Sequence, residues 1–453
     1  MRTTNRASYT PQMSHPPDTV TSNIHEPAIK LAGPRSSAPH SHHDELPHLN
    51  LGQSLFYSSG GIAGGLVFTM MNNALPLFLL SYTMPLGLPA FFSPGQPIPA
   101  TIVAMLTNER SFFGGLIQPL VGRLSDHTRS RIGKRSPYVL GGGIGAALSI
   151  ALLALHPPFW LMVMAVTLTG ISLFIALGPY NALLVDIARP AQRGRIGGMV
   201  ALAGVLGATL FSLLSKFLWD TSRLYVFLIS AALVAISMTA VALGVHERPS
   251  LILPIHRDRE KGLWKEVAAN TPLARYVAAM AVYWLGAGAA APFITRFGVV
   301  ELKIPESDSF TLLLVIVLAT AAGAVIFGFL ADRFGKKRVL QPALVLFAVA
   351  ALAGSQVPNL GWALPVMLLV GLGNAAPTAL HIPLLADFVP EERAGALMGF
   401  ANMIWSVAQP VGSLLAGLLV DVSGSYRGIF IFAAVCMALS AIVMTKVPET
   451  TEL

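Results

Sequence analysis

The stretch Gly122-Arg-Leu-Ser-Asp-His-Thr-Arg-Ser-Arg-Ile-Gly-Lys-Arg135 is strongly basic, carries one aspartate and lies between two long apolar runs. A shorter copy, Gly328-Phe-Leu-Ala-Asp-Arg-Phe-Gly-Lys-Lys-Arg338, lies between two more apolar runs in the second part of the chain. Charge this dense between apolar segments predicts a hairpin that turns at a membrane surface. The repetition predicts a protein made of two similar halves.

The composition agrees with a membrane protein. Of the 453 residues, 54% are hydrophobic and 11% are charged, whereas soluble domains carry roughly 25% charged residues. The net charge of +8 is explained by Lys and Arg that fix the topology in loops on one side of the bilayer, so no nucleic-acid partner is expected. A single cysteine, Cys436, excludes an internal disulfide.

Because a spanning helix needs about 20 mostly apolar residues, the apolar runs predict twelve of them. Their expected ranges are 56–81, 99–122, 136–155, 159–186, 195–218, 224–245, 272–297, 310–331, 339–357, 361–387, 395–420 and 427–447.

Lys and Arg concentrate in the loops that follow the second, fourth, sixth, eighth and tenth runs. By the positive-inside rule these loops and both termini are cytoplasmic, and we expect a multi-pass protein of the plasma or inner membrane. The predicted domains are a disordered cytoplasmic tail (1–50), an N-terminal six-helix bundle (51–245), a cytoplasmic linker (246–270) and a C-terminal six-helix bundle (271–453). The tail is rich in histidine, which we interpret as compositional bias rather than a metal site.

A second pair of matching segments supports the duplication. Leu183-Leu-Val-Asp-Ile-Ala-Arg-Pro-Ala-Gln-Arg193 matches Leu384-Leu-Ala-Asp-Phe-Val-Pro-Glu-Glu-Arg393 with one residue deleted. Each half therefore has the same order of helix pair, basic turn, helix pair, Asp-Pro-Arg turn and helix pair. Parallel six-helix halves indicate a transporter whose site lies at their interface.

The basic turn after the second run, with its copy after the eighth, resembles the motif of the major facilitator superfamily over roughly residues 55–447. The segments Gln118-Pro-Leu-Val-Gly122, Ser125–Tyr138 and Gly178-Pro-Tyr-Asn-Ala-Leu-Leu-Val-Asp186 are similar to its sucrose-type branch. The resemblance implies an all-α integral membrane fold of twelve transmembrane helices in two parallel repeats. Two departures are Asn181, where plant sucrose carriers have arginine, and Gln118, where melibiose-type permeases have a cation-site aspartate.

The same resemblance implies a cytoplasmic gate that closes one side of the carrier. In the family, the acid of the turn pairs with an arginine or a helix N-terminus across the bundle, and such pairs exist in one state of the transport cycle. The alternative is that the basic residues serve only to set topology. The candidate gate residues are Arg123, Asp126, Arg129, Arg131, Asp186, Arg193, Asp332, Arg333, Asp387 and Arg393.

Glu109 and Arg110 lie inside the second predicted span, about 20 Å from its cytoplasmic end. Ionisable residues within a membrane are functional candidates, and we expect Glu109 to carry the coupling proton while Arg110 modulates its pKa. The alternatives are a structural ion pair near the outer mouth, or a helix that begins later than predicted.

Polar and aromatic residues on otherwise apolar helices are candidates for binding a solute, because a sugar needs hydrogen-bonding amides and an aromatic platform. The alternative is that these groups bond helices to one another. His381 is also a candidate second titrating group. The candidate binding residues are Asn72, Asn73, Tyr180, Asn181, Tyr283, Asn374, His381, Asn402, Trp405 and Gln409, with Trp284 beside them.

These features predict a monomeric, proton-coupled symporter of a sugar or related polyhydroxylated solute. No nucleotide-binding loop, metal-ligand spacing or nucleophile–base arrangement is found, so neither an enzyme nor a cofactor is expected. The alternatives are a gradient-driven exporter of amphiphilic compounds and a non-transporting receptor or assembly factor on the same fold.

Overall fold

The computed structural model describes residues 49–85, 95–130, 132–245, 247, 263–390 and 393–449. Regular structure in these ranges is helical, apart from an isolated β-bridge between Thr83 and Pro97. The helices of the first part are α1 (Leu51–Thr69), η1 (Met70–Ala74), α2 (Leu75–Phe78), η2 (Leu79–Ser81), α3 (Ala100–His127), α4 (Ser136–Ala154), α5 (Phe159–Ile187), α6 (Pro190–Leu218) and α7 (Arg223–Gly244). Those of the second part are α8 (Leu263–Ala269), α9 (Thr271–Ala290), η3 (Ala291–Phe293), α10 (Ile294–Val300), α11 (Glu306–Phe334), α12 (Lys336–Gly354), α13 (Leu360–Ala386), α14 (Ala394–Ser423) and α15 (Arg427–Thr445).

The predicted all-α membrane fold is confirmed. Eleven helical segments within the described residues are long and apolar enough to cross a membrane, and α3 occupies the range of the remaining predicted span. The bounds differ by five residues at three places: α1 begins at Leu51 rather than at 56, α3 ends at His127 rather than at 122, and α6 begins at Pro190 rather than at 195. Hydropathy marks the part of a helix that lies in hydrocarbon, and the first turn of α6 contains Arg193, which hydropathy counts as loop.

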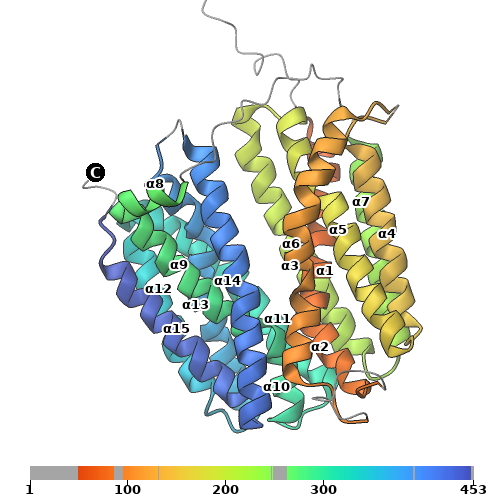
Figure 1. Ribbon diagram of the computed structural model, residues 1–453, viewed down its shortest axis with the longest axis vertical. Helices are drawn as coiled ribbons and strands as arrows, with labels where there is room; N and C mark the ends of the chain where they lie inside the picture. The colour runs from red at the N-terminus through yellow and green to blue at the C-terminus, as the bar shows by residue number, and fades with distance from the viewer. Residues whose placement is uncertain are drawn as a thin grey trace, which may run out of the picture. The chain divides into compact units, whose positions relative to one another are not determined.

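The helices pack in two groups (Figure 1). In the first group α1 lies against α6 and α7, α4 against α5 and α7, and α3 against α5. In the second group α9 lies against α14 and α15, α11 against α13, and α12 against α13 and α15. The two halves meet where α3 contacts α14 and where α6 contacts α11.

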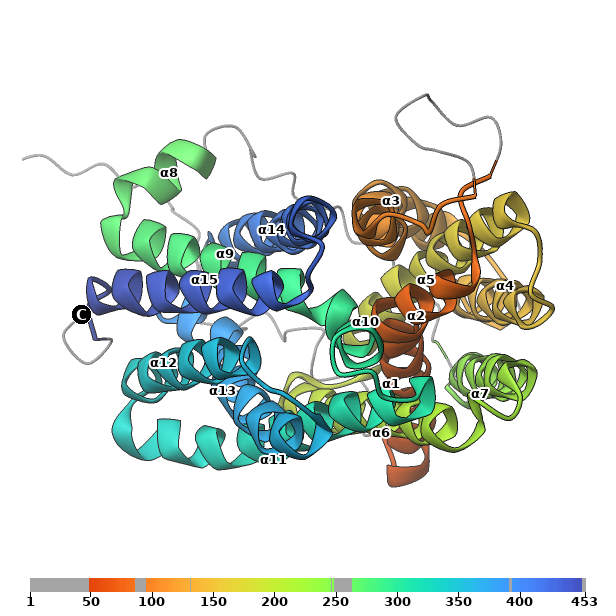
Figure 2. The same cartoon turned by 90° about the horizontal axis from the view of Figure 1, so that it is seen from below.

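The first span of each half is interrupted by a proline. In the first span, Pro76 has no N–H and its ring would collide with the carbonyl of Asn72 in a regular helix. The π-helix η1 accommodates it, with the N–H of Leu75 bonded to the carbonyl of Met70. In the span of α9 and α10, Pro292 lies in the 3₁₀ turn η3. The two interruptions contact each other, and α10 lies beside η1 and α2 (Figure 2).

Several predicted regions lie wholly or largely outside the described residues. They include the tail through residue 48, most of the linker 246–270, and Arg131. The end of the linker is described as α8, where Trp264 is exposed and its ring packs edge-on against Phe400. We call the end of the helices that carries Asp126 and Asp332 the basic-turn end, and the opposite end, where α3 begins, the far end.

Candidate functional site

At the basic-turn end of the first half, Arg135 is shared by two carboxylates. Its Nη2 lies 3.3 Å from Asp126 Oδ1, and its Nε donates to Asp186 Oδ2 at 2.6 Å. Lys134 Nζ lies 3.0 Å from the same oxygen of Asp186. Asp126 ends α3, Asp186 ends α5 and Arg135 precedes α4, so the turn joins three helices of one half.

Glu247, just beyond α7, caps the start of α4 and was not among the sequence candidates. Its carboxylate accepts the backbone N–H groups of Lys134, Arg135 and Ser136 at 2.7–3.0 Å, and the Ser136 hydroxyl at 2.8 Å. A carboxylate at a helix N-terminus satisfies orphan N–H groups and complements the helix dipole. Gly133 has φ +112°, and a Cβ there would lie 2.6 Å from Glu247 Cδ, so the turn requires glycine.

The second half has an equivalent pairing of acidic and basic side chains, with fewer partners for each acid. Lys336 Nζ donates to both oxygens of Asp387 at 2.6 and 2.7 Å, and Arg393 donates to Glu266 of α8. Asp332 and Arg333 are exposed, and the Arg333 guanidinium lies 5.3 Å from the ring centroid of Phe334.

The pairs made by Asp126, Asp186 and Asp387 each lie within one half. Arg193 also bonds within its half, to the carbonyls of Ala188 and Val185, and Arg123 and Arg129 are exposed. The cytoplasmic latch between halves therefore stays a prediction, for a state other than this one.

Polar contacts between the halves gather at the far end. Asp421 of α14 accepts the backbone N–H groups of Ala100 and Thr101 at 2.7 and 2.9 Å and the Thr101 hydroxyl at 2.6 Å, which caps α3. Glu306 of α11 accepts from Trp219 Nε1 at 2.6 Å and from Arg223 at 2.8 Å. Lys216 pairs with Asp308 between α6 and α11. These contacts seal the far end.

The helix interruptions bring unpaired polar atoms to the junction of the halves. Asn72 and Asn73 are buried on η1, and each Nδ2 bonds to a carbonyl of its own helix. Within the described residues, Oδ1 of both asparagines is buried without a hydrogen-bond donor. The Thr295 hydroxyl of α10 donates to the carbonyl of Asn73 at 2.7 Å and so links the two interruptions.

Arg296 follows Thr295 on α10 and is 2% exposed. Nε and Nη1 of its guanidinium have no hydrogen-bond acceptor among the described residues. Asp421 interacts electrostatically with this guanidinium, but a buried charge whose N–H groups lack acceptors is costly in a protein interior, which marks Arg296 as a functional candidate. Sequence reasoning missed this residue, although the signal, an arginine inside a predicted span, was present.

A polar and aromatic cluster lies near mid-height in the second half. The buried Tyr283 hydroxyl donates to Asn374 Oδ1 at 2.6 Å. The Trp284 ring meets that of His381 edge-on, and its Nε1 is buried without an acceptor in the described part of the chain. His381 also contacts the ring of Trp405, whose Nε1 donates to the carbonyl of Val277. The structure therefore brings together four of the predicted binding residues.

The other candidates lie elsewhere. Tyr180 is buried and stacks on Tyr57, and each hydroxyl donates to the other's backbone carbonyl, so this pair binds α1 to α5. Asn181 and Asn402 are exposed and Gln409 is half-buried. Glu109 and Arg110 lie within α3, but their side chains are outside the described set.

Comparison with known proteins decides the family. The Major Facilitator Superfamily profile matches residues 57–319 and 277–452. This chain belongs to the major facilitator superfamily. It is a multi-pass membrane carrier of small solutes and not an enzyme.

Two relatives are similar in sequence, and one solved structure has a similar fold. The gentisate transporter of Corynebacterium glutamicum is 25% identical over 353 residues, which are 74% of this chain and 77% of the relative. The niacin transporter NiaP of Acinetobacter baylyi is 28% identical over 133 residues, which span 29% of this chain and 30% of that relative. A bacterial homologue of the human lysosomal transporter Spinster, solved inward-facing and unoccupied, has a TM-score of 0.64 at 13% identity over 88% of this chain and 95% of that one.

Proposed function

We propose that the carrier is a proton-coupled symporter of a sugar or related polyhydroxylated solute, which binds between the halves. The observation that carries the proposal is the junction of η1 and η3. Interrupted helices at corresponding positions of two repeats are where secondary transporters build their sites. Here the interruptions are in the first span of each half, and they contact each other.

The chemistry of the unpaired atoms supports a solute that both donates and accepts hydrogen bonds. Asn72 Oδ1 and Asn73 Oδ1 need donors, whereas Trp284 Nε1 needs an acceptor. A hydroxyl group serves either role, and the indole rings of Trp284 and Trp405 supply an aromatic face. The resemblance of the Gln118–Tyr138 region to the sucrose-type branch points to the same class of solute.

The sealed far end supports alternating access. The contacts of Asp421, Glu306 and Lys216 must break before a solute can enter from that side. At the basic-turn end, Asp126, Asp186 and Asp387 instead bond within their own halves. A solute at the junction would therefore exchange through the basic-turn end in this state.

For proton coupling, Glu109 remains the first candidate and His381 the second. A carboxyl group inside the span can bind a proton on one side and release it on the other. We expect Glu109→Gln to abolish uptake driven by a pH gradient and to spare solute exchange at equal pH. Full pH-driven accumulation by this variant would reject the role.

The solute is tested by counterflow and uptake in proteoliposomes, with a panel of sugars and with and without a pH gradient. We expect Asn73→Ala to reduce uptake of the transported sugar about fivefold or more, since one buried polar contact is worth about 1–3 kcal/mol. Thr169→Ala is the matched control, because that buried hydroxyl bonds to the carbonyl of Ala165 in its own helix. Equal activity of the two variants would contradict a site at the junction.

An aromatic carboxylate is the second candidate solute. The buried guanidinium of Arg296, whose Nε and Nη1 lack acceptors among the described residues, favours it. The gentisate and niacin transporters named above carry such acids by their names. Nicotinate and 2,5-dihydroxybenzoate therefore belong in the same uptake panel. Uptake of these acids but not of sugars, lost in Arg296→Gln, would replace the sugar proposal. Efflux of amphiphilic dyes would instead indicate an exporter, and no flux of any solute a receptor.

A further inference from the structure

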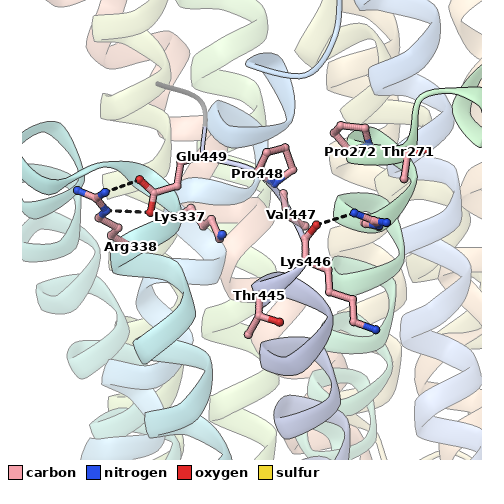
Figure 3. Close-up of a pocket in the computed structure, with 10 residues that line it drawn as sticks. Thr271, Pro272, Lys337, Arg338, Thr445, Lys446, Val447, Pro448 and Glu449 are labelled. Carbon is pink, nitrogen blue, oxygen red and sulfur yellow. Dashed lines mark hydrogen bonds and ion pairs between the residues drawn. The ribbon is translucent and has the colours of Figure 1, made fainter. Parts of the chain in front are cut away.

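At the basic-turn end, a pocket of about 540 Å³ opens where α9, α12 and the end of α15 meet. It is lined by the first turns of α9 and α12 and by the segment that follows α15 (Figure 3). None of its residues belongs to the junction of the halves or to the predicted gate. The pocket is therefore a feature separate from the transport route described above.

The lining is strongly basic. Four of the lining residues, Arg275, Lys337, Arg338 and Lys446, are cationic, and one, Glu449, is acidic. Arg338 forms a bidentate pair with Glu449 through Nε at 2.8 Å and Nη2 at 2.7 Å, as Figure 3 shows. The pocket thus keeps a formal excess of three positive charges, which raises its affinity for anions.

The four cationic side chains differ in their bonding partners. Arg275 Nη1 donates to the carbonyl of Lys446 at 3.0 Å and thereby caps the end of α15. The ammonium groups of Lys337 and Lys446 have no carboxylate or carbonyl partner among the described residues. In addition, α12 begins at Gly335 without a side-chain cap, and the free N–H groups of a helix start favour an anion. Two lysines and one helix start are thus available to a ligand.

The position of the pocket relates it to the bilayer surface. The membrane-spanning segments that form it run from Thr271, from Lys336 and to Thr445, so the pocket lies where hydrocarbon gives way to headgroups. Pro272, Val447 and Pro448 supply apolar wall beside the charges. The volume exceeds that of a bare phosphate and falls in the range of small-ligand sites, about 300–1,000 Å³.

We propose that this pocket binds an anionic phosphate group, held by Lys337, Lys446 and the start of α12. Basic pockets between transmembrane helices bind the headgroups of anionic lipids, and a free phosphate has the same chemistry. Such a ligand would join α12 to α15 within the second half. The proposal does not depend on the identity of the transported solute.

The test measures retention of lipid by the full-length protein in native mass spectrometry, with phosphatidylglycerol and with phosphatidylcholine. We expect selective retention of phosphatidylglycerol. Lys337→Gln with Lys446→Gln should weaken it roughly 30-fold, since each basic residue near a membrane surface is worth about 1 kcal/mol. Lys337→Arg with Lys446→Arg should retain it. Arg195→Gln with Lys265→Gln is the matched control, because these exposed cations lie at the same end but outside the pocket.

Inorganic phosphate, titrated calorimetrically into delipidated protein, distinguishes the two sources. If phosphate binds and the pocket variant loses this binding, while phosphatidylglycerol is not preferred, then the ligand is free phosphate. Equal binding of both probes by the pocket variant and the control variant would overturn the proposal. If the double variant melts below the wild type, the single variants Lys337→Gln and Lys446→Gln provide the same comparison, with an expected loss of about fivefold each.

Discussion

Arg135 in the basic turn bonds to two acids at once. Its guanidinium is shared between Asp126 and Asp186, so the loss of either acid leaves the other to hold it. Asp126 is the more exposed of the two acids and therefore the one that can change partners during transport.

We expect Asp126→Asn to reduce uptake at least about tenfold, in the range typical of coupling between conformational states. The amount of protein in the membrane should stay unchanged, because Arg135 keeps Asp186 as its partner. Uptake by the variant, normalised to the amount inserted, is the measurement. Asp332→Asn, in the shorter turn of the second half, should have a smaller effect. Unchanged uptake in Asp126→Asn would show that the turn only sets topology.

Glu247 gives a prediction of stability rather than of transport. Glu247→Ala removes the acceptor of three backbone N–H groups and one hydroxyl at the start of α4. We expect a loss of about 1–2 kcal/mol, the usual cost of deleting an N-cap, seen as a lower melting temperature in detergent. Glu449→Ala, which breaks an exposed pair, should change it less. An equal shift in both variants would contradict the capping role.

At the scale of elements, the sequence predicted the spans but not all of their shapes. The apolar runs gave the ranges of the long helices among the described residues. The charged end of α3 and the first turn of α6 were missed because they lie beyond the hydrocarbon. Pro76 was visible in the sequence, but whether a proline kinks a helix or produces a π-helix depends on the packing around it. The cap by Glu247 joins segments more than a hundred residues apart, which no local pattern reveals.

The residues of the candidate site were predicted only in part, because their contacts also depend on how the helices pack. Tyr283, Asn374, His381 and Trp405 lie together in the structure, as their positions near mid-height of three helices would allow. Tyr180 instead pairs with Tyr57, because the direction in which a side chain points depends on the rotation of its helix, which an apolar run does not specify.

The contact of α1 with α6 depends on glycine and gives a prediction with an internal control. A Cβ on Gly65 would lie 1.9 Å from the carbonyl oxygen of Gly204, whereas a Cβ on Gly64 meets nothing within 4 Å. We expect Gly65→Ala to force the helices apart at a cost of about 1–3 kcal/mol, measured as a lower melting temperature and a lower yield of monodisperse protein. Gly64→Ala should behave as the wild type. Matching stability of the two variants would show that the helices do not pack this closely.

For the whole molecule, we expect the contacts between the halves at the far end, which we call the far-end seal, to stabilise the state described here. Asp421 is its most connected member, since its carboxylate holds the start of α3 from the opposite half. An interaction present in one state shifts the equilibrium by its own free energy. Removing it should therefore favour the state in which the far end is open.

Thr295, buried between the interruptions, is the place to measure this shift. In a Cys436→Ser background, Thr295→Cys should react slowly with a maleimide in nanodiscs, because the seal covers it. We expect Asp421→Ala to accelerate labelling about fivefold or more, the low end of measured conformational couplings. Glu301→Gln is the matched control: Glu301 bonds Ser425 and Arg427 at the same end but within one half, so it should leave the rate unchanged. If both variants label equally fast, loosening of the second half rather than opening of the seal exposes the junction.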